Sequence, residues 1–398
     1  MKSELARRIV FTLGALLVYR LGTNIPLPGL NPYPPFPHQS FALPSIFSLW
    51  ILPYLTAAIL IQLVSMVSSR LGALSRSGEA GRRKVAHYTI GLAIFLAAVQ
   101  AYGVASGLQT VPNLVSEPGG LFLLSTTVTL TGGTVFLIWL SQQITARGIG
   151  NGLAVILFAG VAAKLPEEVA TMVGQTWHGA LSVGRTSLLT ILWVALVGAV
   201  VFVERARRRV PVEFAGRKLG NGFVLAQSTH LSLKLNSAGL MPTVVASWLY
   251  VLPLMLASLV LDRNSPWLAI GYELTSPTHV IHMILSSVAI IILAFIYTSF
   301  VVDPSHAADS LGKRGAVIPG IEPGEPTAAH LDRMVSYTTC IGAIYLAAVF
   351  LVPELLLSYG QAPFYLGGAS VLIVVCTVLD IETQVRGLTL TGPGGVYS

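Results

Sequence analysis

The chain has 398 residues, of which 54% are hydrophobic and only 10% are charged, and its formal net charge is +7 at pH 7. A soluble domain of this size needs roughly 25% charged residues to cover its surface, so the composition excludes a water-soluble globular protein and indicates that lipid surrounds much of the chain. Cys340 and Cys376 both lie in apolar runs, which excludes a disulfide framework and a cysteine-based zinc site.

The first apolar run follows Arg7 and Arg8 and continues past Arg20 to Pro26. Its start is similar to a signal peptide, but no small-x-small cleavage site follows cleanly, so we expect a retained first span. Arg20 is the one charge well inside this span, and snorkelling or pairing near the outer surface accounts for it.

Ten apolar stretches reach, or nearly reach, the length of about 20 residues that crosses a bilayer. They are 9–25, 46–67, 88–107, 121–141, 151–165, 186–203, 238–261, 280–301, 335–357 and 365–381. Two of them, 151–165 and 365–381, are short, follow glycines and hold the same place in two groups of five, which is typical of an inverted repeat. We expect an all-α membrane protein with ten transmembrane helices in two pseudo-symmetric halves of five, residues 1–165 and 166–398.

The distribution of lysine and arginine predicts that both termini lie in the cytoplasm. With the N-terminus inside, the inner segments are 1–8, 68–87, 142–150, 204–237, 302–334 and 382–398, and they hold 20 of the 24 basic residues, as the positive-inside rule requires. Segment 302–334 carries five acidic residues against three basic ones, so its side follows from parity and not from charge.

Three loops stand out by composition or length. The outer loop 26–44 contains seven prolines, which prevent a helix through most of it. The inner loops 204–237 and 302–334 far exceed the length of about 12–15 residues beyond which loops are usually functional.

The sequence lacks the common motifs of nucleotide hydrolysis, metal binding and redox chemistry. It contains no Gly-x-x-x-x-Gly-Lys-Ser/Thr, His-Glu-x-x-His or Cys-x-x-Cys motif. Every Asp and Glu lies in a loop or at the end of a span, Glu354 and Asp380 included, whereas an ion-coupled transporter needs an ionisable group at membrane depth. We therefore expect neither an enzyme nor a bound cofactor, and a small-solute transporter is disfavoured.

Seven short motifs are distributed between about residue 7 and residue 384. They are RLG with IPLPG at 20–29, LPYLTA with IQL at 52–63, EAGRRK at 79–84, ARGIGNG at 146–152, QSTHL with Lys234, Asn236 and AG at 227–239, PGI with PGE at 319–325, and PFY with GG and Ser370 at 363–370. In this order and at these relative positions, they resemble the SecY family, the channel subunit of the bacterial preprotein translocase.

The resemblance implies two five-helix halves, hinged between spans five and six, around an hourglass pore with a ring of aliphatic side chains at its waist. Matched by motif, the ring residues are Ile51, Leu55, Leu153, Leu157, Val244 and Ile373. A narrow apolar collar dewets and blocks ions, and i,i+4 spacing puts Ile51 with Leu55, and Leu153 with Leu157, on one helix face. Without the resemblance, ordinary packing accounts for six aliphatic residues in membrane spans.

The resemblance also implies a lateral gate between spans two and seven and a docking surface on the inner loops. The candidate gate residues are Thr56, Gln62 and Asn236, for which hydrogen bonding between helices is the alternative role. The candidate docking residues are Arg205, Arg207, Arg208, Arg209, Arg217, Lys218, Lys313, Arg314 and Glu322. The basic run at 205–209 suits ribosomal RNA or an acidic partner, although membrane topology and anionic lipid alone also explain it.

Three departures from the family pattern concern the plug and the motor. Loop 26–44 is shorter than usual, so we expect the plug helix of region 30–44 to be absent or reduced to a stub at Ser40, Phe41 and Ala42. Glu322 stands where the family has an arginine associated with the motor, and GNG at 220–222 replaces a basic pair. The chain is therefore a candidate for a specialised paralogue that serves few substrates or a different motor, and loss of motor-driven transport is the alternative.

The function implied by the resemblance is a passive protein-conducting channel for secretion and membrane-protein insertion at the bacterial inner membrane. The implied partners are SecE-like and SecG-like small membrane subunits, a SecA-like motor ATPase or a ribosome or both, signal-bearing preproteins and membrane lipids. One alternative is a non-conducting membrane scaffold, because apolar packing looks the same in a sealed bundle. A secondary solute transporter is the less favoured alternative.

Overall fold

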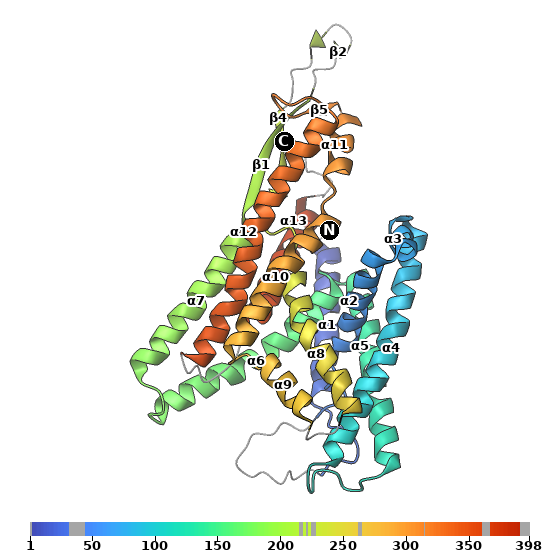
Figure 1. The fold of residues 1–398 in the computed structure, drawn as a ribbon, viewed down its shortest axis with the longest axis vertical. Coiled ribbons are helices and arrows are strands. Elements are labelled where there is room, and N and C mark those ends of the chain that lie inside the picture. The colour runs from blue at the N-terminus through green and yellow to red at the C-terminus, as the bar shows by residue number, and fades with distance from the viewer. Residues whose placement is uncertain are drawn as a thin grey trace. The chain divides into compact units, whose positions relative to one another are not determined.

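The computed structural model describes residues 2–31, 44–214, 218–219, 222–223, 228–261, 265–313, 315–359 and 367–390. The chain divides into two compact units (Figure 1), one formed by Met1–Ala163 with Thr377–Ser398 and the other by Lys164–Cys376. The predicted halves, 1–165 and 166–398, remain a prediction about the repeat.

Helices make up most of the described residues. The first unit contains α1 (Lys2–Thr23), α2 (Leu52–Val67), α3 (Ser69–Arg76), α4 (Glu79–Gln109) and α5 (Gly120–Arg147). The second contains α7 (Val183–Arg205), α8 (Met241–Val260), α9 (Pro266–Thr275), α10 (Val280–Val301), α11 (Pro304–Lys313) and α12 (Glu325–Ser358). Two further helices, α6 (Gly152–Trp177) and α13 (Gly368–Leu390), begin in one unit and end in the other.

Each of the ten predicted stretches falls on one of these helices, although some boundaries differ. Residues 46–51 form turns, and α2 begins at Leu52 with a proline in its first turn, where the missing N–H costs nothing. The two stretches predicted to be short belong to helices of 26 and 23 residues. In α6 the apolar pattern ends near Lys164, but the helix continues through Pro166 because the residues that follow are good helix formers.

Within the described part of the chain, six helical segments are long and apolar enough to cross a membrane. They are α4, α5, α7, α12, the segment Val280–Lys313 that contains α10, and the segment Gly368–Thr389 of α13. The helix α2 is apolar but shorter, and α1 carries three arginines in its 22 residues.

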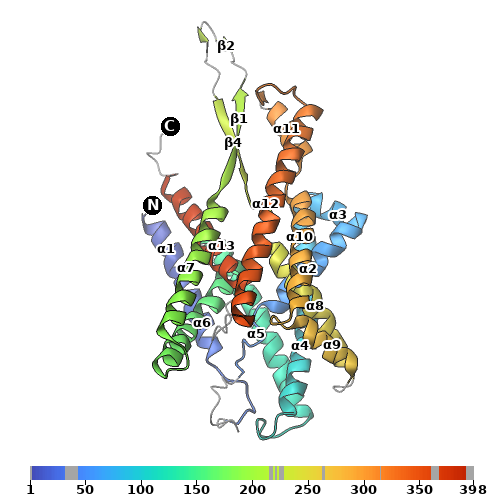
Figure 2. The same ribbon diagram turned by 60° about the vertical axis from the view of Figure 1, so that its left-hand side comes forward.

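The two long loops predicted on the inner side, 204–237 and 302–334, together form a three-stranded sheet, which the sequence did not predict. Strand β1 (Arg207–Phe214) pairs antiparallel with β4 (Ser228–Lys234) and with β5 (Ala316–Val317), while β2 (Lys218–Leu219) pairs with β3 (Gly222–Phe223). Figure 2 shows β1 and β4 as a hairpin that continues from α7, with α11 nearby in the same unit. Loop 302–334 therefore lies on the same side as loop 204–237.

A separate hydrophobic cluster stabilises this sheet. Val210, on β1, is 1% exposed and packs with Ala308 of α11, with Ile318 and with Leu331 of α12. Along β1, Val210 and Val212 are buried while the neighbouring Arg209 and Pro211 are exposed, as expected for a strand with one covered face. The two inner loops are thus one folded body and not two independent connections.

Candidate functional site

The start of α2 carries two of the predicted ring residues. Ile51 is fully buried at the N-cap position of α2, and its carbonyl accepts the first helical hydrogen bond, from the Leu55 N–H at 3.1 Å. Leu55 is also buried. The preceding Trp50 has a φ of 53°, which is uncommon for a residue other than glycine, so the chain enters α2 through a constrained turn.

One face of α6 is directed towards this turn. Leu153, Leu157 and Gly160 are spaced i, i+4 and i+7, so they share a helix face. The indole ring of Trp50 occupies the place that a Cβ on Gly160 would fill. The face of α6 that carries Leu153 and Leu157 therefore lies close to the residue that precedes Ile51, within the first unit.

The start of α6 is held by contacts to three other helices of the first unit. The N–H of Ile149 donates to Thr12 Oγ1 of α1 at 3.0 Å, and the N–H of Gly150 donates to Gln384 Oε1 of α13 at 2.9 Å. The carbonyl of Ser141 on α5 abuts Gly152 so closely that no side chain fits there. These contacts explain the glycine-rich motif at 146–152. They also fix the start of α6, and with it the position of Leu153.

The other two predicted ring residues lie in the second unit. Val244, near the start of α8, and Ile373, in α13, are 7% and 8% exposed. All the predicted ring residues except the half-buried Leu153 are thus buried. The ring that would unite them spans both units, and it stays a prediction.

The predicted gate residues have different surroundings. Thr56 is buried, and its hydroxyl donates to the Leu52 carbonyl of its own helix at 3.0 Å, while Gln62 is half-buried. Asn236 is 4% exposed and lies between β4 and α8, where its amide donates to Glu204 Oε1 at 2.8 Å and to the Gly239 carbonyl at 3.1 Å. Its hydrogen bonds therefore organise the entry into α8.

Glu204 and Tyr345 are two members of this cluster that the sequence did not single out. Glu204 is the penultimate residue of α7, and Tyr345 lies in α12 and donates its O–H to Glu204 Oε1 at 3.2 Å. The apolar context of Tyr345 gave no sign of a polar role. The nearest signal was a lone acidic residue at the end of an apolar span, directly before a basic run.

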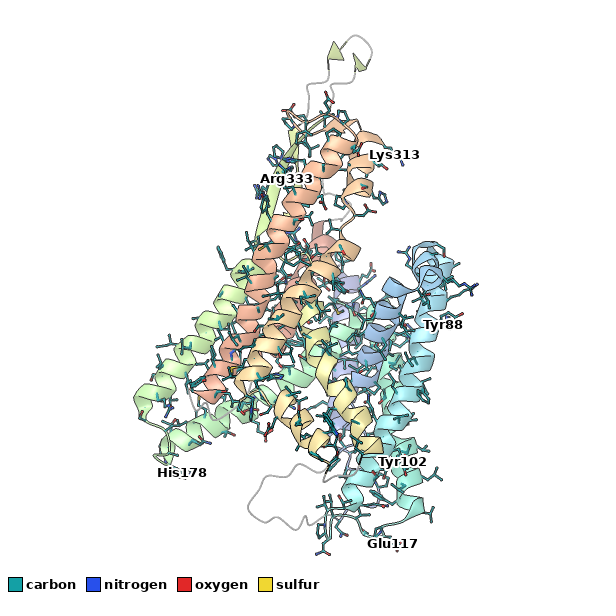
Figure 3. All side chains as sticks on the ribbon, in the orientation of Figure 1. Tyr88, Tyr102, Glu117, His178, Lys313 and Arg333 are labelled. Carbon is teal, nitrogen blue, oxygen red and sulfur yellow. The ribbon has the colours of Figure 1, made fainter. Side chains whose placement is uncertain are left out.

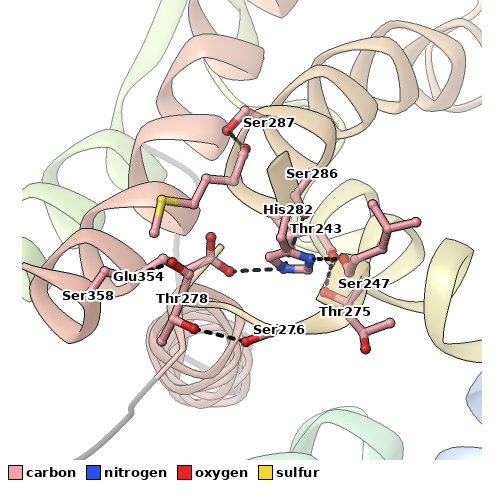
Figure 4. A network of polar contacts seen from close by, with 12 residues as sticks. Thr243, Ser247, Thr275, Ser276, Thr278, His282, Ser286, Ser287, Glu354 and Ser358 are labelled. Carbon is pink, nitrogen blue, oxygen red and sulfur yellow. Dashed lines mark hydrogen bonds and ion pairs between the residues drawn. The ribbon is translucent and has the colours of Figure 1, made fainter. Parts of the chain in front are cut away.

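A second buried polar cluster contains Glu354, which lies near the end of α12, as the sequence predicted, and is enclosed by neighbouring helices (Figure 4). Glu354 lies inside α12 with its side chain 0% exposed, and Nε2 of His282, on α10, is 3.3 Å from its Oε1. His282 Nδ1 is 2.8 Å from the Leu274 carbonyl, and because a carbonyl only accepts, Nδ1 carries a proton. The sequence could not show this pair, since the fold alone brings the two helices together.

The predicted docking residues lie on and around the sheet of the second unit. Arg205, Arg207, Arg208 and Arg209 are exposed, and so are Lys313 at the end of α11 and Glu322 in the turn before α12. Figure 3 shows Lys313 and Arg333 at the opposite end of this unit from His178. Lys218 lies in β2, whereas Arg217, Arg314 and the plug residues Ser40, Phe41 and Ala42 lie outside the described residues.

No group of three or more His, Cys, Asp or Glu residues in the described ranges is placed to hold a metal ion.

Comparison with known proteins decides the family. The SecY family model matches residues 45–382. Protein translocase subunit SecY of Escherichia coli strain K12 is 39% identical over 409 residues, which cover 98% of this chain and 92% of that protein. The chain belongs to the SecY family. SecY of Vibrio cholerae is likewise 39% identical over 406 residues, covering 96% of this chain and 91% of that protein.

Solved structures of SecY-type channels share the fold. A SecY channel described for its plug domain superposes with a TM-score of 0.74 at 19% identity, over 97% of this chain and 93% of that one. Sec61 in the canine ribosome-channel complex superposes with a TM-score of 0.66 at 17% identity, with the same coverage. The predicted fold, ten membrane helices in two halves, and the predicted resemblance to SecY are confirmed, and the chain is a multi-pass membrane protein.

Proposed function

We propose that this chain is the protein-conducting channel of a Sec-type translocase in the bacterial inner membrane, with both termini in the cytoplasm. The observation that carries the proposal is its 39% identity to protein translocase subunit SecY over nearly the whole of both chains. The channel is passive: a preprotein is driven through it by a partner and not by catalysis within the chain.

We assign the pore waist to the six aliphatic ring residues. Ile51 and Leu55 begin α2, and the face of α6 with Leu153 and Leu157 packs towards that turn through the contact of Gly160 with Trp50. Branched aliphatic side chains exclude water from a narrow opening and so block ions, yet they part around a passing chain because nothing ties them by hydrogen bonds. Val244 and Ile373 complete the proposed ring.

The partners follow from the same assignment. We propose SecE-like and SecG-like single-span subunits, and a SecA-like motor ATPase or a ribosome on the exposed arginines of β1. Among the structural relatives, Sec61 is described in a ribosome-channel complex and Ssh1 bound to the yeast 80S ribosome.

A lateral gate between α2 and α8, with Thr56, Gln62 and Asn236 at its polar positions, releases signal sequences into lipid.

The test is protease protection of a signal-bearing preprotein in vesicles that contain the chain, its small subunits, the motor and ATP. We expect protection that disappears without ATP and in the double variant Leu153→Asp with Val244→Asp, because charge hydrates the collar. The control variant, Leu153→Ile with Val244→Ile, keeps the collar apolar and should retain transport. Absence of protection with the correctly inserted wild-type chain would overturn a motor-driven channel and favour a scaffold.

A further inference from the structure

Helix α7, the hairpin of β1 and β4, and helix α8 meet at one junction in the second unit. Strand β1 follows α7 after one residue, and β4 leads through 235–240 into α8. The last rung of the hairpin is the hydrogen bond from the Leu235 N–H to the Ala206 carbonyl, 3.2 Å long. The hairpin is therefore a direct extension of both α7 and α8.

Asn236 lies at this junction, and both the nitrogen and the oxygen of its side-chain amide form hydrogen bonds. Its Nδ2 donates to Glu204 Oε1 at 2.8 Å and to the Gly239 carbonyl at 3.1 Å, and its Oδ1 accepts from the Gly239 N–H at 3.0 Å. Gly239 has a φ of +66°, a conformation that favours glycine. These bonds close the irregular segment between β4 and α8 into a compact turn.

Helix α12 also contacts this junction. The Tyr345 O–H donates to the same Glu204 Oε1 at 3.2 Å. One turn earlier, Gly342 lies so close that a Cβ there would be 2.9 Å from the Leu235 carbonyl oxygen and 3.4 Å from Asn236 Cα. One carboxylate oxygen thus joins α7, α12 and the start of α8.

We propose that Glu204 and Tyr345 are positioning residues that hold Asn236, so that a partner docked on the β1–β4 hairpin moves α8 through this cluster. The proposal rests on the proposed function, in which α8 is one wall of the gate. Without the cluster, residues 235–240 have no regular secondary structure to resist bending, and displacement of the hairpin would be absorbed there. With it, the hairpin and the start of α8 move together.

The experiment measures initial rates of ATP-driven preprotein protection at increasing motor concentration, for the wild type, Tyr345→Phe, Glu204→Ala and Glu204→Gln. Tyr345→Phe removes one O–H and leaves the ring, so the chain folds. We expect Tyr345→Phe and Glu204→Ala to lower the maximal rate at least threefold without changing the half-maximal motor concentration. Glu204→Gln keeps an oxygen acceptor and should recover most of the rate.

Two controls separate coupling from docking and from general damage. Tyr337→Phe, on an exposed position of α12, should leave both parameters unchanged, and Arg208→Ala with Arg209→Ala should raise the half-maximal motor concentration. The inference is overturned if Tyr345→Phe and Glu204→Ala keep the wild-type maximal rate, or if they change only the half-maximal concentration. A wild-type chain that shows no protection at all overturns the proposed function instead.

Discussion

At the scale of single residues, the pair of His282 and Glu354 differs most from what the sequence suggested. His282 Nδ1 faces a carbonyl, while Nε2 faces both Glu354 at 3.3 Å and the Ser286 hydroxyl at 3.3 Å. Nε2 of His282 therefore lies within reach of both the Glu354 carboxyl group and the Ser286 hydroxyl group. The pair joins α10 to α12 and, through Leu274, to the end of α9.

A buried carboxyl group in a membrane helix is also the feature that a solute transporter requires. Glu354 lies near the end of α12, where the sequence places the end of a span, so this carboxyl group by itself does not indicate a transporter. The transporter is also disfavoured by family membership, since the relatives that match nearly the whole chain are protein translocase subunits. Ser358 Oγ, on the next turn of α12, donates to the Thr278 carbonyl at 3.4 Å, which fits a role in tying α12 to the α9–α10 connection.

We expect Glu354→Ala to lower the free energy of unfolding by about 1–3 kcal/mol, because it removes the carboxyl group that faces Nε2 of the buried His282. Thermal unfolding of the purified chain in detergent measures the loss. Glu354→Gln keeps an oxygen near Nε2 and should lose less. Glu79→Ala, which breaks an exposed ion pair with Arg83, should change stability by less than about 1 kcal/mol. Equal losses in Glu354→Ala and Glu79→Ala would show that burial of the pair contributes nothing.

At the scale of elements, the connection between α5 and α6 sets the position of Leu153 and Leu157, two of the proposed ring residues. The Ser141 carbonyl fills the space beside Gly152, and Thr145 Oγ1 accepts from the Gly152 N–H at 2.8 Å. The side chain of Asn151 accepts from the Leu153 N–H at 3.0 Å and satisfies one of the free donors at the start of α6. The start of α6 is thus determined by backbone packing against α5.

We expect Gly152→Ala to destabilise the chain by about 1–3 kcal/mol, because the added methyl group must displace the α5 backbone. The matched control is Gly174→Ala in the same helix, where nothing lies within 4 Å of the added carbon. That change should stabilise by about 0.5–1 kcal/mol, the usual difference between alanine and glycine in a helix. Denaturant titration of both variants distinguishes them, and a stable Gly152→Ala chain would contradict the close packing.

At the scale of the whole molecule, one end of the second unit combines both long inner loops into a single platform. Strand β5 pairs with β1, so the exposed arginines of β1 and the turn that carries Glu322 belong to one folded body. A partner that binds this platform meets a basic strand and an acidic turn together. Glu322 is therefore part of a composite surface.

We expect Glu322→Arg to lower the half-maximal concentration of a SecA-like motor by up to about fivefold, since an exposed ion pair contributes at most about 1 kcal/mol. The fold should be unaffected, because Thr327 Oγ1 bonds the backbone carbonyl of Glu322 and not its side chain. The effect should shrink at high salt. Unchanged motor affinity and transport at low salt would show that this position does not contact the motor.

The sequence by itself determined the class of the protein, because a shortage of charge and ten apolar stretches leave only a multi-spanning membrane protein. Its motifs also determined the family, and the stretches located every long helix, since hydrophobicity and length are local properties. Helix ends were less predictable: Pro166 lies inside α6, and residues 46–51 form turns. The turn at 46–51 depends on contacts such as that of Trp50 with Gly160.

Only the tertiary structure decided which polar groups work together. Glu204, Asn236 and Tyr345 come from three separate elements, as do Leu274, His282 and Glu354, and no local pattern relates them. The sheet that joins the two long loops also depends on tertiary structure, because strand β5 has only two residues and forms by pairing with β1. Which residues far apart in the chain form a hydrogen bond depends on how the helices pack, and helix packing depends on the whole fold.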